Sequence, residues 1–281
     1  MTIILEAFAN LAILTFVITS MLAMGLSLTT KQIIEPLRNV RLVVKALLAN
    51  FVLVPLVAYL ILLVIPLAEP LAIGLILLAT AAGAPFLPKL VEAAKGNIAF
   101  GVGLMVLLMV VTIIYLPLVM PLLLPGVAVN PMDIAGSLIV LMLIPLAIGL
   151  FINARYDDTA ASLQPVMSQT STISLILLSV LMLVLNFKNI ISVIGTGAII
   201  AIIIFIVVSF VLAFFLGGPG RDTKSVLGLG TAQRNLSAAL VVGSQNFDDP
   251  NVVIMVIVAG VLMLFILMPI AGEIGKRSQT T

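Results

Sequence analysis

The sequence predicts an all-helical protein that crosses a lipid membrane several times. Of its 281 residues, 63% are hydrophobic and only 9% are charged, whereas a soluble domain has about 25% charged residues. The mean hydropathy is +1.38, and the apolar runs are continuous, which is typical of membrane helices rather than of the alternating strands of a β-barrel. These observations exclude a soluble enzyme, a nucleic-acid-binding module and a disordered protein.

Nine segments are long and apolar enough to form membrane helices, each of which needs about 20 mostly apolar residues. The predicted spans are 3–24, 42–64, 71–94, 98–124, 134–153, 166–185, 191–215, 225–245 and 252–271. The loops between them are short, so we expect a single transmembrane domain over residues 1–281 with no soluble ATPase. The chain has no phosphate-binding G-x-x-x-x-G-K-[ST] loop, and any pumping must therefore be driven by gradients.

Positive charges sort to one side of this nine-span arrangement. Only Lys188 falls on the opposite side, and Lys89 and Arg234 lie within spans. The ten cations on the first side are Lys31, Arg38, Arg41, Lys45, Lys95, Arg155, Arg221, Lys224, Lys276 and Arg277. Because cytoplasmic loops are enriched in lysine and arginine, we expect a cytoplasmic C-terminus and an outside N-terminus. The expected location is the bacterial inner (plasma) membrane or an equivalent membrane.

The third and eighth spans differ from the others because each contains a helix-breaking run. The third holds Pro85 and Pro88, and the eighth holds a polar run over 228–237. Proline removes helical hydrogen bonds, and polar residues at mid-depth are costly unless they line a cavity or pack within protein. Each is the third span of a four-span set, and the two sets run in opposite directions. Such paired breaks point to the substrate site of a secondary transporter, although each could also be a simple kink.

Arg234 is the most informative residue, because it lies near the middle of its span. An arginine at that depth costs about 2.5–3.5 kcal/mol on insertion scales, so it needs a cavity, a counter-charge or carbonyl oxygens. No aspartate or glutamate lies at the same depth, and Glu92 is nearer the cytoplasmic end of its span. The remaining partners are carbonyls at the negative ends of the half-helices. Arg234 therefore either occupies a cation site, grips an anionic substrate or clamps two helices together.

The other candidate residues are polar groups near the two breaks. Lys89 could belong to the site or extend toward the membrane surface, and Asn50 is a lone amide in the second span. The remaining candidates, at the second break, are Thr231, Gln233, Asn235 and Ser237. The chain has no cysteine or histidine, and no paired mid-membrane carboxylates, activated nucleophile or metal-ligand cluster. We therefore do not expect an enzyme, and no residues can be assigned to a metal site. The sequence does not indicate an oligomeric state.

Four segments carry a more specific pattern. Residues 21–28 read M-L-A-M-G-L-S-L, and Asn50-Phe51 are followed by Pro55. Residues 74–77 read G-L-I-L and precede K-G-N-I-A at 95–99, and residues 230–235 are followed by A-A-L at 238–240. In order and spacing these segments resemble the bile acid:sodium symporter family, whose second crossover motif is E-x-G-x-Q-N.

The resemblance implies two inverted five-helix repeats, with the first helix missing here. A core domain would comprise spans 42–64, 71–94, 98–124, 191–215, 225–245 and 252–271, with the two broken helices crossing at its centre. A panel domain would comprise spans 3–24, 134–153 and 166–185. An amphipathic organic anion would bind between panel and core, which would move to expose it alternately to each side of the lipid bilayer.

The resemblance also implies two sodium ions at the crossing, yet most of their side-chain ligands are replaced. Leu87 and Pro88 occupy the positions of the family's serine and asparagine ligands. Gly230 replaces its acidic ligand, and Arg234 replaces its glutamine ligand. Gly101 and Met105 stand where the family has hydroxyls, and Asn50 and Asn235 resemble retained polar positions. The interrupted segment of the third span, which includes Pro85 and Pro88, would then lie at the crossing and provide no side-chain ligand for sodium.

The sequence therefore predicts a secondary active transporter of a small organic anion that is independent of sodium. In this hypothesis Arg234, together with Lys89, acts as a tethered cation in place of the ion, and no cofactor is needed. The alternative within the family is a sodium-coupled symporter of bile-acid-like or other organic anions. A channel or a non-transporting membrane receptor is the alternative from another class. We expect no nucleic-acid partner.

Overall fold

The structure is a computed structural model, which describes residues 2–34, 38–124, 130–185, 193 and 195–277. Within these ranges the chain is almost entirely helical and contains no strand, so the predicted all-helical fold is confirmed. Lys188 and the first residues of the predicted span 191–215 lie outside the described residues.

The first half of the chain contains the long helices α1 (Thr2–Ser27) and α7 (Ile98–Leu123). The short helix α2 (Thr30–Ile34) follows α1. Between α2 and α7 the described elements are α3 (Val40–Leu48), the π-helical turn η2 (Ala49–Leu53), α4 (Val54–Val64), α5 (Glu69–Thr80) and α6 (Leu87–Ala93).

The second half begins with α8 (Pro131–Leu138), the π-helical turn η3 (Ile139–Leu143) and α9 (Ile144–Arg155). Helix α10 (Asp157–Leu185) follows. The remaining described helices are α12 (Ala198–Leu216), α13 (Arg221–Ala232), α14 (Leu236–Asn246) and α15 (Pro250–Arg277).

Six helical segments in the described chain are long and apolar enough to cross a membrane. They are Ala7–Ser27, Val40–Val64, Ile98–Leu123, Pro131–Arg155, Ala198–Leu216 and Pro250–Arg277. Of the three other predicted spans, 166–185 lies within α10, and 71–94 and 225–245 each fall on two shorter helices. The chain is therefore an integral membrane protein, whereas the count of nine crossings stays a prediction.

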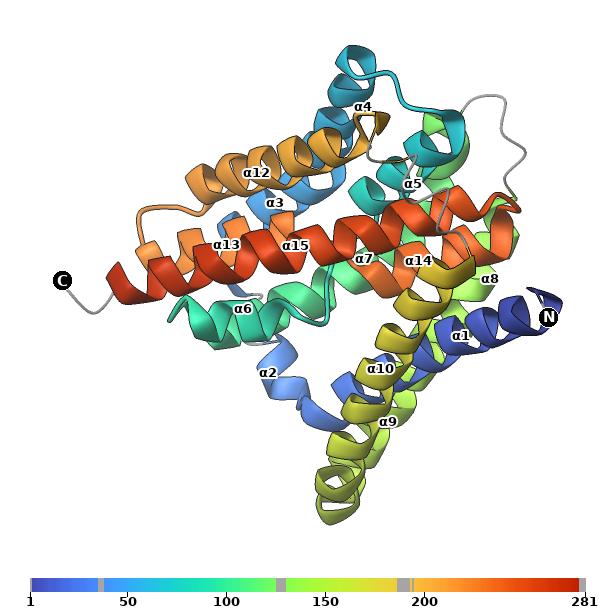
Figure 1. The fold of residues 1–281 in the computed structure, drawn as a ribbon. Coiled ribbons are helices and arrows are strands. Elements are labelled where there is room, and N and C mark those ends of the chain that lie inside the picture. The colour runs from blue at the N-terminus through green and yellow to red at the C-terminus, as the bar shows by residue number, and fades with distance from the viewer. Residues whose placement is uncertain (1, 35–37, 125–129, 186–192, 194, 278–281) are drawn as a thin grey trace.

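The two broken helices lie against each other and run in opposite directions. Helix α13 contacts α6, and α14 contacts α5, so the first half of one broken helix packs beside the second half of the other. Figure 1 shows α6 and α13 toward one end of the molecule and α5 and α14 toward the other. Inverted repeats require this local arrangement, and the repeat relation over the two whole halves stays a prediction.

Helices α1, α9 and α10 pack together beside the rest of the structure (Figure 1). Gly25 and Gly149 make the close contact between α1 and α9. A Cβ at Gly25 would lie 2.9 Å from the Gly149 Cα, and a Cβ at Gly149 would lie 2.9 Å from the Gly25 Cα. Small residues of this kind let membrane helices approach closely. These helices match the spans predicted for the panel, and the division of the chain into panel and core stays a prediction.

Candidate functional site

The two helix breaks meet in the interior of the protein. The first break, residues 81–86, separates α5 from α6, and the second, residues 233–235, separates α13 from α14. We call these two segments together the crossing. Pro85 has no N–H with which to continue α5, whereas Pro88 lies in the first turn of α6, where the missing N–H costs nothing. Pro88 therefore helps to start a helix and is not part of the break.

Arg234 lies at the centre of the crossing and is completely buried. Its Nε donates to the Leu78 carbonyl at 2.9 Å, and its Nη2 donates to the Ala79 carbonyl at 2.8 Å. Its Nη1 donates to Asn50 Oδ1 at 2.7 Å and to the Thr231 carbonyl at 2.9 Å. The guanidinium thus joins four oxygens that belong to three different helical segments.

Three of these oxygens come from helix ends that carry partial negative charge. Leu78 and Ala79 lie in the last turn of α5, and Thr231 lies in the last turn of α13. The last four carbonyls of a helix have no partner within it, and the helix macrodipole places negative charge there. A cation between two such ends compensates both of them, which explains how an arginine is accommodated without a carboxylate.

Asn50 connects the guanidinium to the second broken helix. Its Oδ1 accepts from Arg234, while its Nδ2 donates to Thr231 Oγ1 and to the Ala46 carbonyl, both at 3.0 Å. Asn50 lies in the π-helical turn η2, and Pro55 follows at the start of α4. π-Helical turns often occur at functional sites.

Tyr115 of α7 supports the segment that carries Asn50. Its hydroxyl donates to the Phe51 carbonyl at 2.6 Å, and Pro55, four residues further on, has no N–H with which to bond that carbonyl. The Tyr115 and Phe51 rings also pack with their centroids 4.8 Å apart.

Asn235 ties the second break to the first. Its backbone N–H donates to the Ala81 carbonyl at 2.9 Å, and its Nδ2 donates to the Gly83 carbonyl at 3.0 Å. Its Oδ1 accepts from the Ala238 N–H at 3.1 Å and so caps the N-terminus of α14. Asn235 therefore satisfies backbone groups on both broken helices at once.

Thr112 of α7 satisfies the first break from its other side. Its hydroxyl accepts from the Ala82 N–H at 2.9 Å and donates to the Ala82 carbonyl at 3.1 Å. Thr112 is fully buried. It was not among the predicted site residues, because a single threonine in an apolar span usually bonds to its own helix and nothing in the sequence distinguishes it.

Replacing Thr112 by valine is expected to destabilise the protein by about 1–3 kcal/mol, because the buried Ala82 N–H loses its partner. The Ala82 carbonyl then keeps only the longer bond from Asn235 Nδ2, at 3.4 Å. The measurement is the thermal unfolding midpoint of the purified protein in detergent. Thr172→Val is the matched control, since Thr172 is exposed and its hydroxyl donates to the Ser168 carbonyl of its own helix. Equal midpoints for the two variants would contradict this role of Thr112.

Lys89 does not join Arg234. Its side chain is exposed, and its Nζ lies 5.8 Å from the centre of the Phe86 ring. Glu92 is exposed as well, and among the hydrogen bonds of the described residues Arg234 has no carboxylate partner. Arg234 therefore provides the positive charge at the crossing, and Lys89 does not contribute to it.

Two positions where the family resemblance implies sodium ligands are filled by apolar packing. A Cβ added at Gly230 would lie 2.9 Å from Leu87 Cδ2 and 3.4 Å from Leu104 Cδ2. A Cβ added at Gly101 would lie 3.0 Å from Val91 Cγ2. Sodium takes oxygen ligands, so these surroundings do not fit an ion, and the oxygens nearby at Leu78, Ala79, Thr231 and Asn50 already accept from Arg234.

Gln233 and Ser237 are the predicted site residues with unused hydrogen-bonding capacity. Both are buried, and neither Gln233 Oε1 nor Ser237 Oγ has a hydrogen-bond partner among the described residues. A buried polar atom without a partner costs free energy, so in a folded protein each such atom calls for an explanation, of which a bound water, ion or ligand is one. These two atoms are therefore candidates for contact with a substrate.

Comparison with known proteins agrees with these features. The model of the sodium bile acid symporter family matches residues 14–193. The probable sodium/metabolite cotransporter BASS2, chloroplastic, of Oryza sativa subsp. japonica is 24% identical over 242 residues. That alignment covers 83% of this chain, and the chain spans 57% of the length of that relative. The apolar helices, the two breaks and the family match together place this chain in the sodium bile acid symporter family of membrane transporters.

Proposed function

We propose that this protein is a secondary active transporter of a small organic anion, in which Arg234 takes the place of a sodium ion. The carrying observation is the fully buried guanidinium with four hydrogen bonds to oxygens of α5, α13 and the η2 turn. A sodium ion at this point would provide one positive charge to the same oxygens. Because Arg234 is covalently attached, its charge cannot leave with the substrate, and this site then cannot couple transport to a sodium gradient.

The driving force in this proposal is the gradient of the substrate itself or of an exchanged anion. Proton coupling has little support, since the chain has no histidine and Glu92 is exposed. Substrate would bind beside the crossing, where α14 contacts α1 and the η3 turn. Gln233 Oε1 and Ser237 Oγ would face it as unused polar atoms. Movement of the helices α1, α9 and α10 against the rest would expose the site alternately to the outside and to the cytoplasm.

Uptake is expected to be the same in sodium and in choline buffers at several pH values. The measurement uses proteoliposomes loaded with one anion and supplied outside with labelled carboxylates or sulfonates, which are first selected by a thermal-shift screen with and without sodium. Empty liposomes are the control for leakage. Uptake that requires sodium would contradict the tethered-cation proposal. The protein would then be an anion transporter coupled to sodium.

The sodium-coupled symporter of bile-acid-like or other organic anions is the second candidate. The family name and the name of the rice relative favour it. A channel or a non-transporting receptor is the candidate from another class. Saturable uptake that is accelerated by anion on the far side identifies a carrier, and ligand binding without flux identifies a receptor. Our proposal includes a bacterial inner membrane location with the N-terminus outside and the C-terminus in the cytoplasm.

A further inference from the structure

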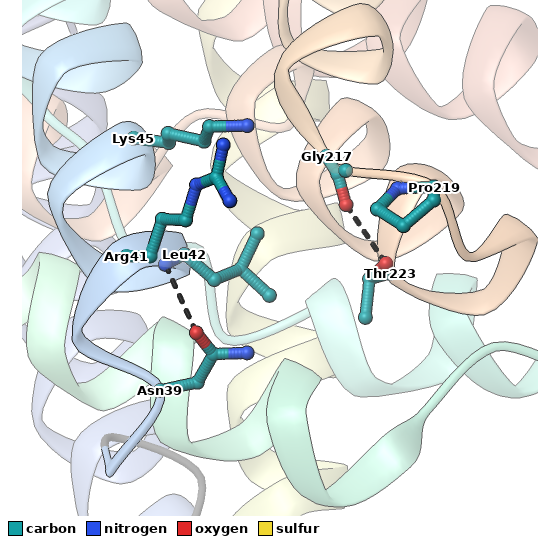
Figure 2. Close-up of a pocket in the computed structure, with 8 residues that line it drawn as sticks. Asn39, Arg41, Leu42, Lys45, Gly217, Pro219 and Thr223 are labelled. Carbon is teal, nitrogen blue, oxygen red and sulfur yellow. Dashed lines mark hydrogen bonds between the residues drawn. The ribbon is translucent and has the colours of Figure 1, made fainter.

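A basic pocket that shares no lining residue with the crossing lies between the start of α3 and the loop that joins α12 to α13. Its volume is about 280 Å³, well above the roughly 10–15 Å³ that one water needs. One wall carries Asn39, Arg41, Leu42 and Lys45, and the other carries Gly217, Gly218, Pro219 and Thr223. Figure 2 shows the Arg41 and Lys45 side chains side by side, extending from α3 toward the gap before the opposite wall.

Within the part of the chain that the structure describes, no acidic side chain is paired with the two cations of this pocket. Arg41 and Lys45 are four residues apart on α3, and neither makes a hydrogen bond or an ion pair with any residue that the structure describes. Asn39 uses its Oδ1 to accept from the Leu42 N–H at 3.2 Å, which leaves its Nδ2 as a further donor. Asp222 is the acidic residue next to this wall and lies in the first turn of α13. Two like charges side by side repel each other, and a bound anion relieves that repulsion.

The opposite wall is held in shape by its own contacts. Thr223 Oγ1 donates to the Gly217 carbonyl at 2.8 Å and to the Gly220 carbonyl at 3.1 Å. A Cβ at Gly217 would lie 2.5 Å from the Lys224 Cα, so the loop is closed tightly against α13. The pocket is therefore formed by two structured walls and does not depend on the basic side chains alone.

The position of the pocket favours a lipid over a free ion. It lies where the apolar segments Val40–Val64 and Ala198–Leu216 begin and end, which is the level of the phospholipid phosphates. The helices beside it expose large apolar side chains, with Val44 and Leu48 on α3 and Phe215 on α12. Acyl chains can lie on such a surface while a phosphate lies beside the cations. Figure 1 places the α12–α13 loop at the same end of the molecule as the end of α15.

We propose that this pocket binds the phosphate headgroup of an anionic phospholipid at the cytoplasmic surface of the membrane. The headgroup phosphate lies between Arg41 and Lys45, with the Asn39 Nδ2 as a third donor. This site is separate from the crossing, and it does not depend on the substrate or on the coupling ion.

Thermal unfolding of the full-length protein in detergent tests this site. Phosphatidylglycerol, phosphatidylcholine and inorganic phosphate are each titrated against the wild type and the double variant Arg41→Gln/Lys45→Gln. Lys31→Gln/Arg155→Gln is the matched control, because it removes the same charge from two exposed residues outside the pocket. Phosphatidylglycerol is expected to raise the midpoint of the wild type and the control, and the double variant is expected to need about tenfold or more lipid for the same shift.

Three results would overturn the proposal. In the first, the double variant responds to phosphatidylglycerol as the wild type does. In the second, phosphatidylcholine stabilises all proteins equally well. In the third, inorganic phosphate alone reproduces the effect, which assigns the pocket to a soluble phosphate and not to a lipid. If the double variant folds poorly in phosphatidylcholine, Arg41→Gln alone replaces it with the same expectation at a smaller shift.

Discussion

Replacing Arg234 by glutamine is expected to abolish most transport and to lower the free energy of unfolding by about 2–6 kcal/mol. Arginine donates four hydrogen bonds at the crossing, whereas a glutamine amide has only two N–H donors and is shorter. At least two of the four oxygens therefore lose their donor, at about 1–3 kcal/mol each. The positive charge between the ends of α5 and α13 is also lost, so the variant stays impaired even when sodium is plentiful.

The measurement pairs the unfolding midpoint with uptake per folded molecule. Arg234→Lys keeps the charge but offers a point charge in place of the planar fork of donors, and we expect an intermediate loss in both readouts. Arg155→Gln is the control for loss of one positive charge, since Arg155 is exposed at the end of α9. If folded Arg234→Gln protein transports normally, Arg234 is a structural clamp and the tethered-cation proposal fails.

Replacing Gly83 by alanine is expected to lower the free energy of unfolding of the protein by about 2–5 kcal/mol. Gly83 has a φ of +82°, and a Cβ there would collide with the Met109 N and lie 2.6 Å from the Met105 carbonyl oxygen. The left-handed backbone costs an alanine about 1–2 kcal/mol, and overpacking adds about 1–3 kcal/mol. The neighbours are backbone atoms of α7, so they cannot move aside as a flexible side chain does. The Gly83 carbonyl that accepts from Asn235 would be displaced as well.

The Gly83 prediction is measured by the thermal unfolding midpoint and by the yield of monodisperse protein. Gly272→Ala is the matched control, because Gly272 lies within α15 and a Cβ there would meet nothing within 4 Å. That control is expected to be neutral or to gain about 0.5–1 kcal/mol from reduced backbone freedom. A Gly83→Ala protein as stable as Gly272→Ala would mean that α7 does not press on the first break.

The fold could be predicted largely from local sequence signals. Runs of about 20 apolar residues predict membrane helices by their length alone, and six such segments are present in the structure. The breaks followed from the same kind of signal, since Pro85 ends helical bonding. The sequence did not separate Pro85, which lies in a break, from Pro88, which starts α6. A proline is tolerated in the first turn of a helix, and where that turn begins depends on the neighbouring helices.

For the candidate site, the sequence could indicate which unusual polar side chains take part, but not which groups they contact. Arg234 and Asn50 stood out because a charge or an amide is costly in an apolar span. Thr112 did not stand out, and its role depends on the approach of α7 to Ala82. For Lys89 the sequence left two alternatives, a place in the site or a side chain that extends toward the membrane surface, and the structure shows it exposed and without a bond to Arg234.

The sequence by itself determined that this protein lies in a membrane and that no aspartate or glutamate is expected at the depth of Arg234. It also determined the family, through the order of its motifs and the match over residues 14–193. The tertiary structure alone decided which oxygens receive the guanidinium of Arg234. Three of them are backbone carbonyls of Leu78, Ala79 and Thr231. Every residue carries such a carbonyl, so only the packing of α5 against α14 and of α6 against α13 selects those that face Arg234.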